Sequence, residues 1–191
     1  MHVEQDESPA GTALVIIDML STWDFPDGSA LLRQALAIAP AIARLKRRCQ
    51  AAGVPVIYAN DNHGRWRSDH RQLVQEALEQ AGPGAGLTRL LKPADEDYFV
   101  LKPLHNAFFG TPLELLLRHL KLRHLLITGV ASDQCVAVTA AHAHMREYQV
   151  VVPRDTVASL TAARNRAALL QFEQALNLRT TPAPRLRLPL G

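Results

Sequence analysis

The chain has 191 residues, is 48% hydrophobic and carries a formal net charge of +3 at pH 7. This length suits one folded domain, and the hydrophobic content is sufficient for a sizeable core. No apolar run reaches the ~18 residues that a membrane span needs, and the polar, acidic N-terminus does not resemble a signal peptide. Cys49 and Cys135 are too few for a disulfide scaffold and suit a reducing compartment. We therefore expect a cytoplasmic protein with one domain over residues 1–191 and terminal tails at 1–11 and 181–191.

The positive charges are dispersed among carboxylates, and only residues 45–48 form a basic cluster. Nucleic-acid binding requires a basic stripe with aromatic platforms or a recognised module, and neither is visible. The cluster is typical of the solvated face of a helix. The sequence therefore argues against nucleic-acid and membrane partners.

Apolar runs alternate with helix-like stretches along the whole chain. Several of the runs are continuous in Leu, Val and Ile rather than alternating, which indicates strands buried on both faces and hence paired in parallel. Right-handed crossovers then place helices on both faces of the sheet. The sequence predicts a Rossmann-like three-layer α/β/α sandwich with a mainly parallel six-stranded sheet. In chain order the elements are strand 13–18, helix 30–52, strand 54–60, helix 69–80, strand 98–101, helix 112–120, strand 124–128, helix 133–147, strand 149–152, helix 162–176 and a short strand near Leu178.

Prolines and glycines mark the boundaries between these elements. Pro40 leaves open whether the first helix is interrupted, and residues 81–86 have the composition of a surface loop. Thr111 before Pro112 is a good helix start, since a capping hydroxyl precedes a first-turn proline. The proline-containing tail 181–191 packs either on the body of the protein or on a partner subunit, and the sequence does not decide between the two.

Three of the predicted strands end in chemically reactive side chains. The first strand finishes at Asp18, the third runs into Lys102, and the fourth leads through Gly129 to Cys135. Ligands of open parallel sheets bind at the carboxyl ends of the strands, so these side chains are expected to meet at one edge. A cysteine at the start of a helix is a candidate nucleophile, because free N–H groups favour a thiolate and a neighbouring oxyanion.

Three segments together carry a family resemblance. They are 15–19 (VIIDM), 101–111 (LKPLHNAFFGT) and 129–135 (GVASDQC), and their order and spacing are specific in combination. On these residues the chain resembles the isochorismatase-like cysteine hydrolases from about Thr12 to the last predicted strand.

The resemblance implies a catalytic triad of Asp18, Lys102 and Cys135. It also implies a cis peptide between Val130 and Ala131, with the amides of Ala131 and Cys135 forming an oxyanion hole. The activity implied is cleavage of a C–N bond in a small amide or carbamoyl compound, through a thioester and without an organic cofactor. Relatives form dimers or tetramers, so a homodimer or homotetramer is expected.

The thiol of Cys135 must lose its proton for this chemistry. Lowering a cysteine pKa from ~8.5 to near 6.5 requires ~2.7 kcal/mol, whereas a helix N-terminus supplies only ~0.3–1 kcal/mol. A desolvated lysine at contact distance supplies the remainder, so we expect Lys102 to lower the thiol pKa. An ionised Asp18 acts in the opposite direction and is better suited to take the proton and later return it.

Aromatic and polar residues near the three strand ends are candidates for the walls of a substrate pocket. An aromatic residue at such a position is more often part of the core than a ligand contact. The candidates are Trp23, Phe25, Trp66, Asn106 and Phe108.

The segment after the second strand bears on a metal. Asp61 and His63 match the Asp-x-His with which nicotinamidases of the same superfamily begin a metal site. His70 comes one position later than the next ligand of that pattern, and no convincing further histidine lies before Lys92. Because the ligand set is incomplete, no metal is predicted.

Other readings of the chain stay open to different degrees. Leu20 stands where a haloacid-dehalogenase-type phosphatase needs a second carboxylate, and no dinucleotide-binding, P-loop or Gly-x-Ser-x-Gly motif occurs. Isochorismatase-type hydrolysis of a vinyl ether is an alternative, although those relatives often lack the cysteine. A metal-assisted nicotinamidase and a non-catalytic binding protein on the same fold are the other two.

Overall fold

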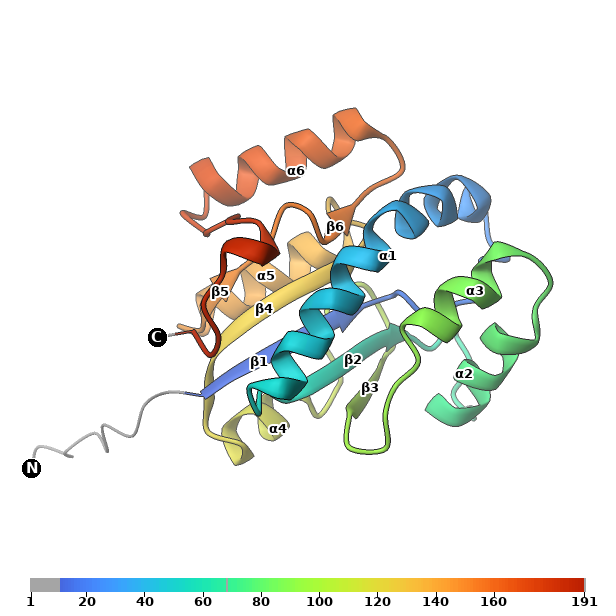
Figure 1. The fold of residues 1–191 in the computed structure, drawn as a ribbon, viewed down its shortest axis with the longest axis horizontal. Helices are drawn as coiled ribbons and strands as arrows, with labels where there is room; N and C mark the ends of the chain where they lie inside the picture. Colours follow the sequence, from blue (N-terminus) through green and yellow to red (C-terminus); the bar gives the residue numbers. More distant parts are fainter. Residues whose placement is uncertain (1–10, 68, 191) are drawn as a thin grey trace, which may run out of the picture.

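A computed structural model of the protein describes residues 11–67 and 69–190 (Figure 1). Parallel pairing joins the strands in the order β3-β2-β1-β4-β5, and β6 lies beside the end of β4. The predicted mainly parallel six-stranded sheet is thus confirmed. The strands are β1 (Gly11–Ile17), β2 (Val56–Asp61), β3 (Tyr98–Lys102), β4 (Leu122–Val130), β5 (Gln149–Val151) and β6 (Val157–Ala158).

Helices cover both faces of this sheet, which makes the three layers of the predicted sandwich (Figure 1). One face packs against α1 (Gly28–Ala51), α2 (His70–Glu79) and α3 (Pro83–Leu90). The other packs against α4 (Leu113–His119), α5 (Cys135–Met145) and α6 (Ala162–Gln174). None of the helices in the described ranges is both long and apolar enough to cross a membrane.

Strand β1 shows why the strand sequences are continuously apolar. Leu14 and Ile16 belong to the core beneath α1, whereas Val15 and Ile17 belong to the core beneath α4 and α5, and all four are essentially fully buried. Each side chain of a central strand lies under one helical layer or the other. The strand is therefore fixed from both sides, and this fixes the position of the residue at its carboxyl end.

The last strand was predicted in the wrong place. Beyond β5 the sheet is completed by β6, Val157–Ala158, whereas the region of Leu178 contributes only one isolated bridge, between Val151 and Arg179. Leu178 is buried because it contacts the core below α6, not because it lies in a strand. A strand of two residues is too short to leave a periodic signal in the sequence.

The surface loop predicted at residues 81–86 is also wrong in part, since α3 begins at Pro83. Proline is well suited to the first turn of a helix, and Leu87 and Leu91 lie buried at helical spacing behind it. Pro40 does not interrupt α1, which continues through it.

The C-terminal tail packs on the body of the protein. Arg48 of α1 donates to the carbonyl oxygens of Ala183 and Leu186, each at 2.6 Å. The amide of Leu190 donates to the hydroxyl of Thr12 in β1 at 2.9 Å. These bonds decide the alternative that the sequence left open for 181–190. Of the predicted N-terminal tail, residues 1–10 lie outside the described residues and Gly11 already belongs to β1.

Candidate active site

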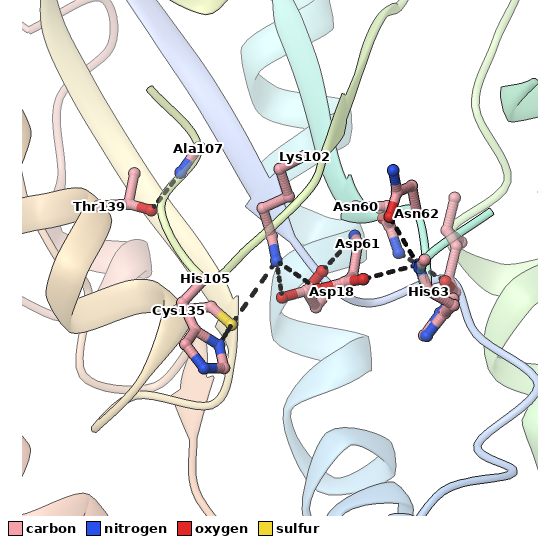
Figure 2. A network of polar contacts seen from close by, with 12 residues as sticks. Asp18, Asn60, Asp61, Asn62, His63, Lys102, His105, Ala107, Cys135 and Thr139 are labelled. Carbon is pink, nitrogen blue, oxygen red and sulfur yellow. Dashed lines mark hydrogen bonds and ion pairs between the residues drawn. The ribbon is translucent and has the colours of Figure 1, made fainter. Parts of the chain in front are cut away.

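The carboxyl edge of the sheet brings three predicted side chains together (Figure 2). Asp18 follows β1, Lys102 is the last residue of β3, and Cys135 is the first residue of α5. The Lys102 Nζ lies 2.8 Å from Asp18 Oδ2 and 3.6 Å from Cys135 Sγ. A cation thus stands between a carboxylate and a thiol, although the three residues are widely separated along the chain.

Lys102 is held as a buried cation. Its side chain is 0% exposed, and a second carboxylate, that of Asp61, lies 3.6 Å from its Nζ. Burial alone lowers the pKa of Lys102. The nearby Asp18, Cys135 and Asp61 together raise it by more than burial lowers it, so the pKa lies above its ordinary value. The ammonium is therefore charged throughout the neutral pH range.

The backbone fixes the position of Asp18. The amide of Asp61 donates to Asp18 Oδ1 at 2.8 Å, while Lys102 contacts the other oxygen. Asp18 itself adopts a left-handed backbone conformation, with φ of 52°. Both carboxylate oxygens are thus engaged by neighbours on β2 and β3, which orients the group at the end of β1.

The thiol of Cys135 differs from the expectation. Burial raises its pKa, Asp18 raises it further, and Lys102 offsets only part of this rise. The expected lowering of the pKa by Lys102 and the helix N-terminus is therefore wrong for the resting site, because burial and the carboxylate outweigh both. Cys135 rests as a neutral thiol, and its proton must leave as the sulfur attacks.

The loop before Cys135 contains the cis peptide between Val130 and Ala131 that the family resemblance implies. The carbonyl of Ala131 accepts hydrogen bonds from the amides of Gln134 and Val136, at 3.0 and 3.2 Å. As the first residue of α5, Cys135 has an amide without a partner inside the helix. Ala131 and Cys135 both border the cavity described next, and their role as an oxyanion hole stays a prediction.

A cavity of about 250 Å³ opens at this edge of the sheet. Its walls combine apolar and polar side chains. Trp23 and Phe25, two predicted pocket residues, belong to them, with ring centroids 6.3 Å apart. The residues lining the cavity are Asp18, Ser21, Trp23, Phe25, Leu31, Asn60, Asp61, His63, His105, Val130, Ala131, Gln134 and Cys135.

The other three predicted pocket residues lie elsewhere. Trp66 is 81% exposed on the surface. Phe108 is buried against Tyr148, and the Asn106 side chain contacts His142 on α5. The chain turns away from the cavity after His105, because the amide of residue 107 donates to the hydroxyl of Thr139 at 3.1 Å. In the described chain these three side chains do not border the cavity.

His105 is a site residue that sequence reasoning missed. Its Nδ1 lies 3.3 Å from Cys135 Sγ, closer than Lys102 Nζ does (Figure 2). The residue follows Lys102 by three positions, and the reversal of the chain between them carries no periodic signal. Gln134 and Asn60 were also not predicted, although Gln134 directly precedes Cys135 and Asn60 lies near the carboxyl end of β2.

The residues that would begin a metal site are present without a complete ligand set. Asp61 and His63 both border the cavity, and the Asp61 carboxylate accepts a hydrogen bond from the His63 amide at 2.6 Å. The His70 ring stacks on Phe99 instead, with centroids 5.0 Å apart. Throughout residues 11–67 and 69–190 there is no group of three or more His, Cys, Asp or Glu side chains that could hold a metal ion.

This fold and this site define an isochorismatase-type hydrolase. Residues 12–182 match the family model of the isochorismatase domain, and the chain belongs to that family. It is accordingly an enzyme, a hydrolase of the isochorismatase family.

Individual proteins similar to this chain include two sequence relatives and a solved structure. YaaI of Bacillus subtilis (strain 168), an uncharacterized isochorismatase family protein, is 38% identical over 88% of this chain and 92% of its own length. The N-carbamoylsarcosine amidase of an Arthrobacter species is 27% identical over 76% of this chain and 58% of its own. Among solved structures, the nicotinamidase/pyrazinamidase PncA from Bacillus subtilis has a TM-score of 0.72 and 26% identity, covering 90% of this chain and 99% of that one.

Proposed function

We propose that the protein is a cysteine hydrolase that cleaves a C–N bond of a small, uncharged amide or carbamoyl compound. The observation that carries this proposal is the placement of Lys102 between Asp18 and Cys135 at the wall of the cavity. An amidase and a nicotinamidase among the similar proteins support the C–N bond as the target.

The proposed first half of the reaction forms a thioester. As Cys135 Sγ attacks the carbonyl carbon, the thiol proton passes to Asp18, and the amides of Ala131 and Cys135 receive the developing oxyanion. The C–N bond then breaks while Asp18 returns the proton to the departing nitrogen. Lys102 stabilises the negative charge that moves between sulfur and carboxylate.

Water completes the cycle in the second half. It attacks the thioester carbon, its proton passes to Asp18, and the sulfur leaves and recovers a proton. The products are a carboxylic or carbamic acid and the free thiol. No step requires an organic cofactor.

The charge on the cavity wall favours an uncharged substrate. The lining includes the carboxylates of Asp18 and Asp61 but, among the described residues, no lysine or arginine. Lys102 lies behind this wall, fully buried and engaged by both carboxylates. A substrate carboxylate would lose its hydration beside two like charges without a cation to compensate.

Asn60 adds a polar contact suited to an amide. The residue is only 1% exposed, and its Nδ2 donates to the carbonyl of Leu20 at 2.5 Å. Its Oδ1 has no hydrogen-bond partner within the described residues, although the residue borders the cavity. A buried acceptor without a partner costs about 1–3 kcal/mol, and a substrate N–H group that reached this oxygen would supply the missing bond.

The test is a panel of small amides and carbamoyl compounds, each neutral member paired with a carboxylate-bearing analogue. We expect ammonia or amine release from neutral members and, by mass spectrometry after rapid acid quenching, an acyl adduct on the Cys135 peptide. The Cys135→Ala variant should lose turnover by at least about 10³-fold. Near-normal turnover by that variant would end the mechanism, and a consistent preference for the carboxylate analogues would end the proposed substrate class.

A further inference from the structure

The sulfur of Cys135 has a second nitrogen neighbour besides Lys102. His105, in the loop after β3, places Nδ1 3.3 Å from Cys135 Sγ. Figure 2 shows this ring on one side of the sulfur, with Lys102 and the two carboxylates on the other. The triad therefore does not include every group in contact with the reacting atom.

We propose that His105 is a further catalytic residue, which carries the proton of the Cys135 thiol by a route separate from Asp18. The proposal rests on the proposed function, because it describes how the same nucleophile is activated. It assigns to the imidazole a direct proton exchange with sulfur during both halves of the reaction.

Solvent access distinguishes His105 from the triad. Lys102 is fully buried and Cys135 is 7% exposed, whereas His105 is an exposed residue that also borders the cavity. The residue thus contacts the sulfur and is also accessible to solvent. A proton that leaves the buried thiol through this ring can equilibrate with solvent, which Lys102 in its buried position does not permit.

Hydrogen bonding also favours this route. Asp18 already accepts from Lys102 at one oxygen and from the Asp61 amide at the other. Within the described residues, the hydrogen-bonding partner of the His105 ring is the Cys135 sulfur. An imidazole accepts and returns protons near neutral pH, and the burial that makes the thiol reluctant to ionise makes a base in contact with it valuable.

The proton balance of the proposed route closes at each step. The S–H bond breaks as the Nδ1–H bond forms, and the sulfur pair makes the S–C bond while the carbonyl pair moves to oxygen. The carbonyl re-forms as the C–N bond breaks, and the departing nitrogen takes the proton from the imidazolium. In the second half, a water proton moves to Nδ1 as oxygen attacks carbon, and it returns to sulfur as the S–C bond breaks.

Alkylation of Cys135 by iodoacetamide tests the proposal without knowledge of the substrate. The rate is followed by mass spectrometry of the Cys135 peptide, which keeps the signal separate from Cys49. In the wild type we expect the rate to rise with pH in two steps, a lower one set by the imidazole base and a higher one set by ionisation of the thiol itself. The charged or titratable groups around this pair are Asp18 after β1, Asp61 on β2, His63, and Lys102 on β3.

The informative variant is His105→Gln, which keeps a polar side chain of similar size. We expect it to lose the lower step and to react about tenfold or more slowly near neutral pH, while Asp18→Asn keeps the lower step. His144→Gln is the matched control, because His144 is an exposed histidine on the same helix as Cys135. It should react like the wild type.

Two outcomes would overturn the assignment. One is a His105→Gln protein whose alkylation profile equals that of the wild type. The other is a slower reaction with both steps intact, which would mean that His105 only shapes the loop. Neither outcome bears on whether Cys135 is the nucleophile, since that depends on the loss of turnover in Cys135→Ala.

Discussion

A lysine–aspartate ion pair lies at each end of β3. The two pairs differ in how many near acceptors surround the lysine. At the start of the strand, Lys46 of α1 lies 2.6 Å from Asp97 and also donates to the Tyr58 hydroxyl and the Lys92 carbonyl, both at 2.9 Å. At its end, Lys102 has one close carboxylate, while Asp61 and Cys135 both lie 3.6 Å away. Lys46 has three near acceptors where Lys102 has one.

This difference separates a structural ion pair from a reactive one. A buried cation is stable when its donors are all used by near acceptors, as those of Lys46 are. The partners of Lys102 line a cavity, and its ammonium group keeps N–H donors that can stabilise negative charge formed during a reaction. Burial and an aspartate partner alone do not mark an active site, whereas incomplete satisfaction beside a cavity does.

The largest effect that separates the pairs is on turnover. Replacing Lys102 by methionine removes the cation between Asp18 and Cys135, and we expect the rate to fall by about 10²–10³-fold. The matched change, Lys46→Met, should leave turnover per folded molecule close to that of the wild type. Turnover is measured with the best amide of the panel, and equal losses in both variants would erase the distinction.

The next effect is on stability, and here we expect the larger loss from Lys46→Met. Lys46→Met leaves Asp97, whose side chain is 1% exposed, without its cation. Removing one partner of a buried pair typically costs about 3–5 kcal/mol of unfolding free energy. Urea unfolding monitored by circular dichroism checks this loss.

A double variant sharpens that measurement. Lys46→Met with Asp97→Leu removes both charges, and we expect it to recover most of the stability that the single change loses. A double variant no more stable than the single one would show that packing, and not an unpaired carboxylate, accounts for the loss.

The smallest effect concerns the two thiols and appears only at alkaline pH. Burial raises the pKa of Cys49 from 9.0 to about 12. The unfolded chain therefore ionises this thiol first, so stability is full below pH 9.0 and is lost as the pH rises toward about 12. Across that window, ionisation of the thiol in the unfolded chain increases the unfolding equilibrium constant about tenfold for each pH unit.

Cys49→Ala should remove this contribution. The comparison is made in a Cys135→Ala background, because burial raises the pKa of Cys135 as well. Unfolding in urea at neutral pH and at about pH 10 should show a smaller alkaline loss without Cys49. The same pH dependence with and without Cys49 would mean that the residue is not buried as described.

Much of the fold could be predicted from local pattern. Residues 13–17 and 125–127 are continuously apolar, which predicts central parallel strands, and both runs are buried in the structure. The errors came where tertiary packing decides. Two residues suffice for β6, because β4 already supplies their partners, and α3 starts within a segment whose glycines and proline are typical of a loop.

The residues of the site also fall into those that the strand pattern predicts and those that depend on tertiary packing. Asp18, Lys102 and Cys135 each end or follow a predicted strand, so parallel topology alone brings them to one edge. His105 acquires its place from how the loop after β3 turns, which no spacing along the chain encodes. Asn60 lies near the carboxyl end of β2, where the same strand-end rule could have placed it. The raised thiol pKa was missed because burial depth follows from the packing of several elements at once.

The tail that Arg48 binds changes what a truncation of this protein would mean. Its residues Ala183, Leu186 and Leu190 are buried with the side chains beneath α1, and Leu190 is joined to Thr12, 178 positions away. A shortened chain would thus expose apolar surface and leave the Arg48 guanidinium without two carbonyl acceptors. Changes at this terminus act as mutations of the interior, and fusion partners are better attached elsewhere.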